Sequence, residues 1–331
     1  MNKLGIFSVA AALFFLAAFS QSSTQAAAKA GSGDAGGKRP IMDTHLHLYM
    51  VTAPGGIPWP SPKQKALYRD VTPSEYKEVA KANGITGAVI VEANPTAKEN
   101  FRILDLIKND PFFHGLVGNP GEIGSADFSA NLAKLAKEPK VVGIRGFLWG
   151  PTLTLDAKQV ADLKDLASKG MSLDIISRGT LNPKDKVAAL AKAVPNLRII
   201  VDHLGGAKSA KVDPEWEAAM TSLAKEHKNV YVKFSSFFDM FNPAANEDNP
   251  WKSPSDLASY KPHFDVLMKA FGPDRLIFGS NWPVVALGGD VGTEIAIAEE
   301  YLKPMGNEVR DKVMYKNAEK FYQRQAIHAS K

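Results

Sequence analysis

Residues Asp43-Thr44-His45-Leu46-His47 follow the short apolar run Ile41-Met42, which comes directly after a polar, glycine-rich stretch. The pattern predicts a β-strand. On a strand, side chains two residues apart point to the same face, so His45 and His47 are expected to share one. Two neutral imidazoles on one face can hold a divalent metal or polarise a carbonyl group. The alternative is a strand edge with two surface histidines, and the rest of the chain is needed to decide.

The N-terminus has the three parts of a signal peptide, predicted to cover residues 1–28 of the 331-residue chain. Met1-Asn2-Lys3 is a short basic region, residues 4–19 are apolar and alanine-rich, and Ala26-Ala27-Ala28 is a small-residue cleavage site. The apolar run is too short and too rich in alanine to favour a membrane span, although an uncleaved anchor is the alternative. We therefore expect an exported protein, periplasmic or secreted, without stable membrane insertion after cleavage and with residues 29–39 as a flexible N-terminus.

Composition limits the remaining possibilities. About 290 residues remain after the signal peptide and the flexible N-terminus, which is near the size of a one-domain α/β barrel. The chain is 45% hydrophobic and 23% charged, enough for a large core. It contains no cysteine, which excludes disulfides and thiolate metal sites. The net charge is +5, but lysines alternate with acidic residues and form no dense basic stripe, so nucleic acid is not an expected partner.

Short apolar runs alternate with amphipathic segments along the rest of the chain. Strands are expected at 41–48, 86–93, 112–119, 141–147, 171–177, 197–203, 229–235 and 275–281. Helices are expected at 73–83, 97–109, 125–137, 156–169, 183–193, 214–228, 255–271, 293–302 and 308–323. This alternation predicts an α/β fold, a single-domain (β/α)8 TIM barrel over residues 40–323 with a C-terminal tail at 324–331. An open doubly wound sheet is the alternative, weakened because no Gly-x-Gly-x-x-Gly follows an early strand.

Three connections that follow strands are too long for simple turns, namely residues 49–70, 236–254 and 284–292. In a TIM barrel such loops lie at the carboxyl end of the strands, where they shape a pocket or a lid. The first carries Trp59, and the second carries the pair Phe237-Phe238, which suggests a pocket with aromatic walls. The alternative is that the loops only cap the barrel or make an oligomer contact; a homo-oligomer is compatible with the sequence.

Polar residues fall at or near most strand ends, and a barrel would bring them into one cavity. Because neighbouring strand residues alternate, Asp202 is expected to face away from His203, whereas Asp43 is expected to point with His45 and His47. Barrel interiors are otherwise filled by branched apolar side chains, so this set is hard to explain by packing. Its members are His45, His47, Glu92, Arg145, Asp174, Arg178, Asp202, His203, Lys233 and Asn281.

Motifs spread over residues 40 to 323 resemble those of the amidohydrolase superfamily, in the branch with pyrone-dicarboxylate and fuconolactone lactonases and related decarboxylases. The resemblance implies a lactonase-like TIM-barrel hydrolase of the metal-dependent type, and also that some members of this branch work without metal. The segments that carry it are Asp43–His47, Gly143–Gly146 (Gly-Ile-Arg-Gly), Val201–Gly205 (Val-Asp-His-Leu-Gly), Asn229–Lys233, Gly272–Pro283 (ending Gly-Ser-Asn-Trp-Pro) and Lys316–Tyr322.

One residue departs from the pattern of the family. Many members carry an aspartate that activates water where this chain has Asn281, and asparagine cannot act as a general base at neutral pH. Three interpretations of the missing general base therefore remain open. Glu92, Asp174 or Asp290 is the base; a histidine is the base; or the chemistry is lost and a ligand-binding barrel remains.

These observations give each residue type an expected role. His45, His47, His203 and Asn281 are predicted to be catalytic, and the three histidines to hold zinc or manganese if a metal is present. Predicted substrate contacts are Arg145, Arg178, Lys233, Glu92, Asp174 and Trp59, with pairing of Lys233 or Arg145 to Asp174 or Glu92 as the alternative. We expect a hydrolase of a lactone or related carboxylic acid derivative, acting on a small carboxylate or lactone. The alternatives are a nonoxidative decarboxylase and a non-catalytic periplasmic binding protein.

Overall fold

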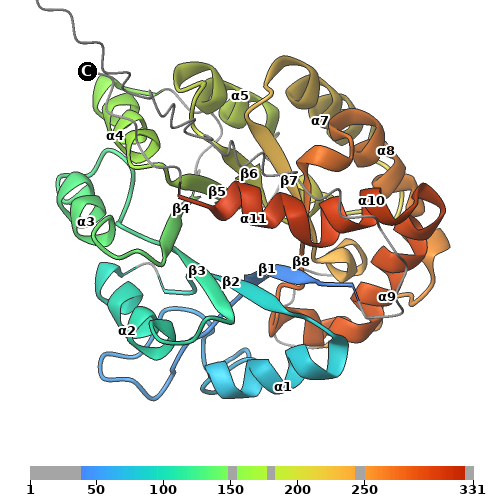
Figure 1. The fold of residues 1–331 in the computed structure, drawn as a ribbon, viewed down its shortest axis with the longest axis horizontal. Coiled ribbons are helices and arrows are strands. Elements are labelled where there is room, and N and C mark those ends of the chain that lie inside the picture. Colours follow the sequence, from blue (N-terminus) through green and yellow to red (C-terminus); the bar gives the residue numbers. More distant parts are fainter. Residues whose placement is uncertain (1–38, 95, 148–154, 177–182, 243–249, 325–331) are drawn as a thin grey trace, which may run out of the picture. The chain divides into compact units, whose positions relative to one another are not determined.

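The computed structural model describes residues 39–94, 96–147, 155–176, 183–242 and 250–324. The predicted signal peptide, most of the predicted flexible N-terminus, most of the tail and Arg178 lie outside these residues. Within them, eight parallel strands follow one another in the sheet in chain order (Figure 1). They are β1 (Met42–Leu46), β2 (Gly87–Val91), β3 (Phe113–Gly118), β4 (Val141–Phe147), β5 (Ser172–Ile176), β6 (Ile199–Val201), β7 (Val230–Ser235) and β8 (Leu276–Gly279).

The two outer strands of this order meet, so the sheet curls into a barrel. A parallel bridge joins Leu46 to Trp282, the His47 amide donates to the Trp282 carbonyl at 2.8 Å, and the Asn281 amide donates to the His45 carbonyl at 2.6 Å. The TIM-barrel prediction is confirmed, and the open doubly wound sheet is excluded.

Helices surround the strands (Figure 1). The side chains of Thr72 and Asp156 cap the starts of the first and fourth, as the sequence predicts for residues of this type. The helices are α1 (Pro73–Asn83), α2 (Ala97–Ile107), α3 (Phe128–Leu135), α4 (Ala157–Ser168), α5 (Pro183–Ala193), α6 (His203–Gly206), α7 (Pro214–Glu226), α8 (Lys261–Phe271), α9 (Val291–Leu302), α10 (Asn307–Asp311) and α11 (Asn317–Tyr322).

Two of the predicted helices are divided. The segment expected at 308–323 contains a π-helical turn at Lys312–Lys316, between α10 and α11. The segment expected at 255–271 begins with a 3-10 turn, η2 (Leu257–Ser259), capped by Asp256, before α8 starts at Lys261. In both cases helical periodicity continues across the break, so the apolar pattern alone could not locate it.

The core has two layers. The inner one fills the barrel with side chains such as Met42, Val89, Val117 and Ile200, and the outer one lies between strands and helices. Phe321 and Tyr322 of α11 join the inner layer, and α11 lies across the barrel in Figure 1. Asn317 of α11 donates to the carbonyls of Pro273 and Leu276, where β8 begins. Helix α11 thus closes the end where the strands start and leaves the other end for a site.

The aromatic pair Phe237-Phe238 does not form a pocket wall, contrary to the sequence-based suggestion. Phe237 is fully buried and packs against Phe234 and Phe264 in the outer layer. Phe238 lies beside Gly288 and Gly289, so that a β-carbon on Gly289 would come within 2.4 Å of its ring. The second and third long loops therefore pack on each other. In the described part of the chain, no helix has both the length and the apolar character needed to cross a bilayer.

Candidate active site

The three predicted histidines meet at the carboxyl end of the strands. The rings of His45 and His47 lie 5.0 Å apart between centroids and nearly perpendicular, and the His203 ring lies 4.4 Å from that of His45. His45 and His47 are buried. His203 follows β6 in a left-handed conformation with φ 56°. The interpretation of two surface histidines on a strand edge is therefore excluded.

Asp43 does not point with these histidines, so that expectation is wrong. Its carboxylate accepts hydrogen bonds from the Tyr76 hydroxyl of α1 at 2.6 Å and from the Ser280 amide at 2.8 Å. The pairing of β1 with β2 shifts register between Asp43 and Leu46, and this shift breaks the simple alternation of side chains. Asp43 also accepts from the His45 amide at 3.0 Å, so it holds the main chain rather than an imidazole ring.

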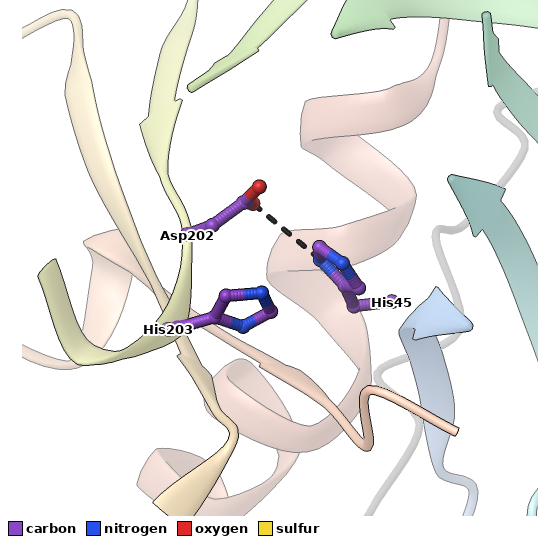
Figure 2. A group of neighbouring side chains, drawn as sticks. All are labelled: His45, Asp202 and His203. Carbon is purple, nitrogen blue, oxygen red and sulfur yellow. Dashed lines mark ion pairs between the residues drawn. The ribbon is translucent and has the colours of Figure 1, made fainter. Parts of the chain in front are cut away.

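Asp202 was expected to face away from His203, and the structure corrects this. One Asp202 oxygen lies 3.4 Å from His45 Nδ1, and Figure 2 shows Asp202, His45 and His203 pointing toward one another. Strand β6 ends at Val201, so the alternation of a strand no longer applies at Asp202. Because His203 and Leu204 both have positive φ, the chain turns sharply and presents neighbouring side chains to the same side.

Lys233 lies at the centre of the charged groups and is fully buried. Its ammonium lies 2.8 Å from an Asp174 oxygen and 3.7 Å from an Asp202 oxygen, and it donates to the Thr44 carbonyl at 2.7 Å. Asp174 also accepts from the Tyr322 hydroxyl at 2.7 Å and has no exposed surface. The sequence left substrate contact and internal pairing as alternatives for Lys233 and Asp174. The structure shows internal pairing, because the two charges lie against each other inside the barrel.

Arg145 and Glu92 lie near the edge of this cluster. Arg145 donates to the Glu92 carbonyl at 3.2 Å, and its guanidinium lies 3.6 Å from the second Asp202 oxygen. Burial raises the pKa of the Glu92 carboxyl, against the opposing charge of Arg145. Trp59 lies beside the site, its ring 5.5 Å from that of His47 and at a steep angle to it. Asp290, one of the candidate bases, instead caps α9 from an exposed position, and so is not part of the site.

Burial keeps all three histidines neutral. It lowers the pKa of His45 and His203 well below the ordinary value of 6.5, and that of His47 to about 3. The positive charges of Lys233 and Arg145 act in the same direction. At neutral pH each ring therefore has one N–H donor and one acceptor nitrogen, and the partner on one side decides which nitrogen faces the site.

These partners differ between His45 of β1 and His47, which directly follows that strand. His47 Nδ1 lies 2.9 Å from the Val91 carbonyl, which only accepts, so its Nε2 is left as an acceptor. His45 Nδ1 lies 3.2 Å from Lys233 Nζ, which only donates, but also 3.4 Å from the Asp202 carboxylate, which accepts. Lys233 thus favours a proton on His45 Nε2, and Asp202 favours one on Nδ1. His45 Nε2 has no hydrogen-bond partner among the described residues.

The same residues fit a divalent metal. Donor atoms of His45, Asp202 and His203 all lie within 4.8 Å of one another, and imidazole and carboxylate are common ligands of zinc and manganese. Neither Asp202 oxygen has a hydrogen-bond partner among the described residues, although His45, Lys233 and Arg145 each lie within 4 Å of the carboxylate. Within the described chain, the group with metal-site spacing thus takes Asp202, rather than the predicted His47, as its third member.

Asn281 and two serines complete the site. Asn281 donates from Nδ2 to the Ser236 hydroxyl oxygen at 2.7 Å, and Ser235 Oγ lies 3.2 Å from His203 Nδ1. Sequence reasoning singled out Asn281 but neither serine. Their position directly after the apolar part of β7 was the available signal, because residues at strand ends face the site in this fold.

Comparison with known proteins gives a consistent result. Residues 42–324 match the family Amidohydro_2, described as amidohydrolase. The chain is 30% identical over 290 residues to the L-fucono-1,5-lactonase of Burkholderia ambifaria. The match covers 85% of this chain and 94% of the relative. An amidohydrolase from Burkholderia multivorans, solved with bound zinc, matches with a TM-score of 0.71 at 21% identity, over 86% of this chain and 99% of that one. The 5-carboxyvanillate decarboxylase of Sphingomonas paucimobilis matches with a TM-score of 0.57 at 12% identity, over 87% and 100%.

Proposed function

The chain belongs to the amidohydrolase family and is a lactonase-like hydrolase, and from this premise we propose that it opens the ring of a lactone or hydrolyses a related carboxylic acid derivative. The observation that carries the proposal is the buried group of three neutral histidines around Asp202, at the end of the barrel where such enzymes place their sites. The similarity to a fuconolactonase along nearly the whole chain supports it.

Ester hydrolysis needs a donor for the carbonyl oxygen and an acceptor for a proton of the attacking water. His45 of β1 and His47, which directly follows that strand, are arranged for these opposite tasks. With Lys233 donating to its Nδ1, His45 offers Nε2–H to the carbonyl oxygen and to the oxyanion that follows. His47 offers Nε2 as the acceptor for water, because its Nδ1 is held by Val91. His47 thus occupies the acceptor position toward water that Asn281 cannot fill as a base, and its pKa of about 3 makes it a weak base in the buried site.

A divalent metal held by His45, Asp202 and His203 would polarise the same carbonyl and lower the pKa of a bound water. Each of the two histidines would offer that metal one unprotonated ring nitrogen, and Asp202 would offer a carboxylate oxygen.

Metal analysis and turnover test the proposal together. The mature protein is purified without chelator beside H45A, H47A and the control H114A, which removes a histidine of β3 outside the site. Lactone hydrolysis by wild type and H114A, lost in H45A and H47A, supports the proposal. About one metal per chain, lost in H45A, would favour the metal-assisted arrangement. The absence of turnover across a broad lactone panel would count against the proposal.

A nonoxidative decarboxylase is the second candidate, because the fold is shared with 5-carboxyvanillate decarboxylase. Release of carbon dioxide from an aromatic or β-keto acid, without ring opening of any lactone, would favour it. A binding protein without activity would show thermal stabilisation by a ligand but no turnover.

We also propose that the protein is exported to the periplasm or secreted. The basic start, the apolar run and the small residues at 26–28 support this. The intact mass of the protein isolated from cell fractions tests it. Export predicts a chain that lacks about 28 residues in the periplasm or medium, whereas a full-length chain in the cytosol contradicts it.

A further inference from the structure

The orientation of the Asn281 amide decides what this residue can do. Its Nδ2 donates to Ser236 Oγ at 2.7 Å, and its Oδ1 has no hydrogen-bond partner among the described residues. The Asn281 side chain acts to raise the pKa of His47, against the larger effect of burial, which lowers it. In this orientation Oδ1 is an acceptor without a partner, and His47 Nε2 is a second acceptor because Nδ1 of that ring is held by the Val91 carbonyl. A water or a substrate hydroxyl can satisfy both.

The opposite orientation would satisfy the protein by itself. If the amide rotated by half a turn, Nδ2 would donate to His47 Nε2, and Oδ1 would accept from Ser236. His47 would then no longer be available to accept a proton from water. For His47 to accept from water, this second orientation of the Asn281 amide must be excluded. Which orientation forms depends on whether the Ser236 hydroxyl is free to donate to Asn281.

Asp239 supplies that constraint. The Ser236 hydroxyl has one proton and donates it to an Asp239 carboxylate oxygen at 2.9 Å. A carboxylate only accepts, so the Ser236 hydroxyl donates its proton to Asp239 and has only an acceptor lone pair left for Asn281. Asn281 must therefore donate to Ser236 from Nδ2. The turn itself is fixed, because the adjacent Phe237 amide donates to the buried Glu294 of α9 at 2.9 Å.

We infer that Asp239, acting through Ser236, is a positioning residue that keeps the Asn281 amide oxygen turned toward the site and His47 Nε2 open for water or a substrate hydroxyl. The inference rests on the proposed function for its catalytic meaning. The arrangement makes the neutral Asn281 a fixed acceptor for a water hydrogen, which is the part of an aspartate's role that does not require a base.

The first test is independent of activity. In protein labelled with ¹⁵N-asparagine, N281D identifies the side-chain amide signals of Asn281 by their loss. We expect D239A to shift these signals, because Nδ2 exchanges a hydroxyl oxygen for an imidazole nitrogen as its partner. The matched control is D256A, which removes a similar bond, from Ser259 Oγ to Asp256 at 3.0 Å in the turn η2. Unchanged Asn281 signals in D239A would overturn the inference.

The second test uses turnover of a lactone substrate. D239A should lower kcat/KM about tenfold in the wild-type background, the size expected when one oriented hydrogen bond is lost, whereas D256A should not. In the N281D background, D239A should lower kcat/KM less than about twofold, because the carboxylate at position 281 has no N–H that could donate to His47 Nε2. An equal cost in both backgrounds would indicate a merely structural role and refute the inference. A wild-type protein without lactonase activity would refute the proposed function, and the amide signals would still decide the orientation.

Discussion

Substitution of Lys233 by methionine should be among the most destabilising single changes in the barrel. Methionine fills a similar volume, so the main loss is the charge. Lys233 is fully buried and lies 2.8 Å from Asp174 and 3.7 Å from Asp202. Its removal leaves Asp174 without the cation that lies 2.8 Å away, and leaves the Thr44 carbonyl without its 2.7 Å donor.

The expected cost is about 3–5 kcal/mol of unfolding free energy at pH 7, the range for breaking a buried ion pair by removal of one partner. Burial already raises the pKa of Asp174 in the wild-type protein, and Lys233 opposes that rise. Without Lys233 the pKa rises further. A carboxyl with a raised folded pKa binds protons more tightly when folded, so its stabilising contribution is present at low pH and is lost as the pH rises through that pKa. The cost of K233M should therefore shrink from pH 7 to pH 5.

Urea unfolding of wild type, K233M, D174N and the double variant at both pH values measures this. The double variant should cost at least about 2 kcal/mol less than the sum of the single variants at pH 7, because it removes both charges together. Single costs that add within about 0.5 kcal/mol would refute the account of a coupled buried pair. A K233M cost that grows toward pH 5 would contradict the sign of the pH dependence.

Three further predictions follow from buried hydrogen bonds and pKa shifts. Burial lowers the pKa of His47 to about 3, so the folded protein binds fewer protons at this residue than the unfolded chain does. The contribution of His47 to stability is therefore present above pH 6.5 and is lost as the pH falls below that value. H47Q should reduce this acid sensitivity in thermal unfolding scans. Tyr76→Phe removes the 2.6 Å bond to Asp43 and should cost about 1.5–3 kcal/mol in urea, with kcat changed less than about twofold. Burial raises the pKa of Glu294 well above 4.5, so Glu294→Gln should cost less than about 1 kcal/mol at pH 7, whereas Glu294→Ala should cost more because the Phe237 amide loses its acceptor.

The barrel was predictable from sequence because its signal is repeated. Eight apolar runs separated by amphipathic helices leave few topologies, and parallel strands need the helical connections that the chain supplies. Element ends were less certain for a physical reason. The start of α8 depends on a local cap at Asp256 and the shape of the last helix on a π-turn, and neither alters the apolar period.

The site was predictable as a list of residues but not as an arrangement. The convergence of the three histidines could be predicted, because His45, His47 and His203 lie at strand ends. The orientations of Asp43 and Asp202 were missed because strand alternation was extended past its limits. A register shift intervenes at Asp43, and left-handed residues follow Asp202. The contacts of Lys233 with Thr44 and Asp174 join three different strands, so no local pattern could have revealed them.

The choice between metal-assisted and metal-free hydrolysis reduces to the position of one proton on His45. Lys233 at 3.2 Å and Asp202 at 3.4 Å compete for Nδ1 of this ring, and each defines a different role for Nε2. A divalent cation at Nε2 would require the proton on Nδ1, and would bring a second positive charge close to the Lys233 ammonium. That repulsion must be offset by Asp202, which already lies near Lys233 and Arg145. Metal affinity should therefore rise when Lys233 is neutralised together with Asp174, and a K233M/D174N protein that binds zinc no more tightly than wild type would show that the ammonium does not oppose the metal.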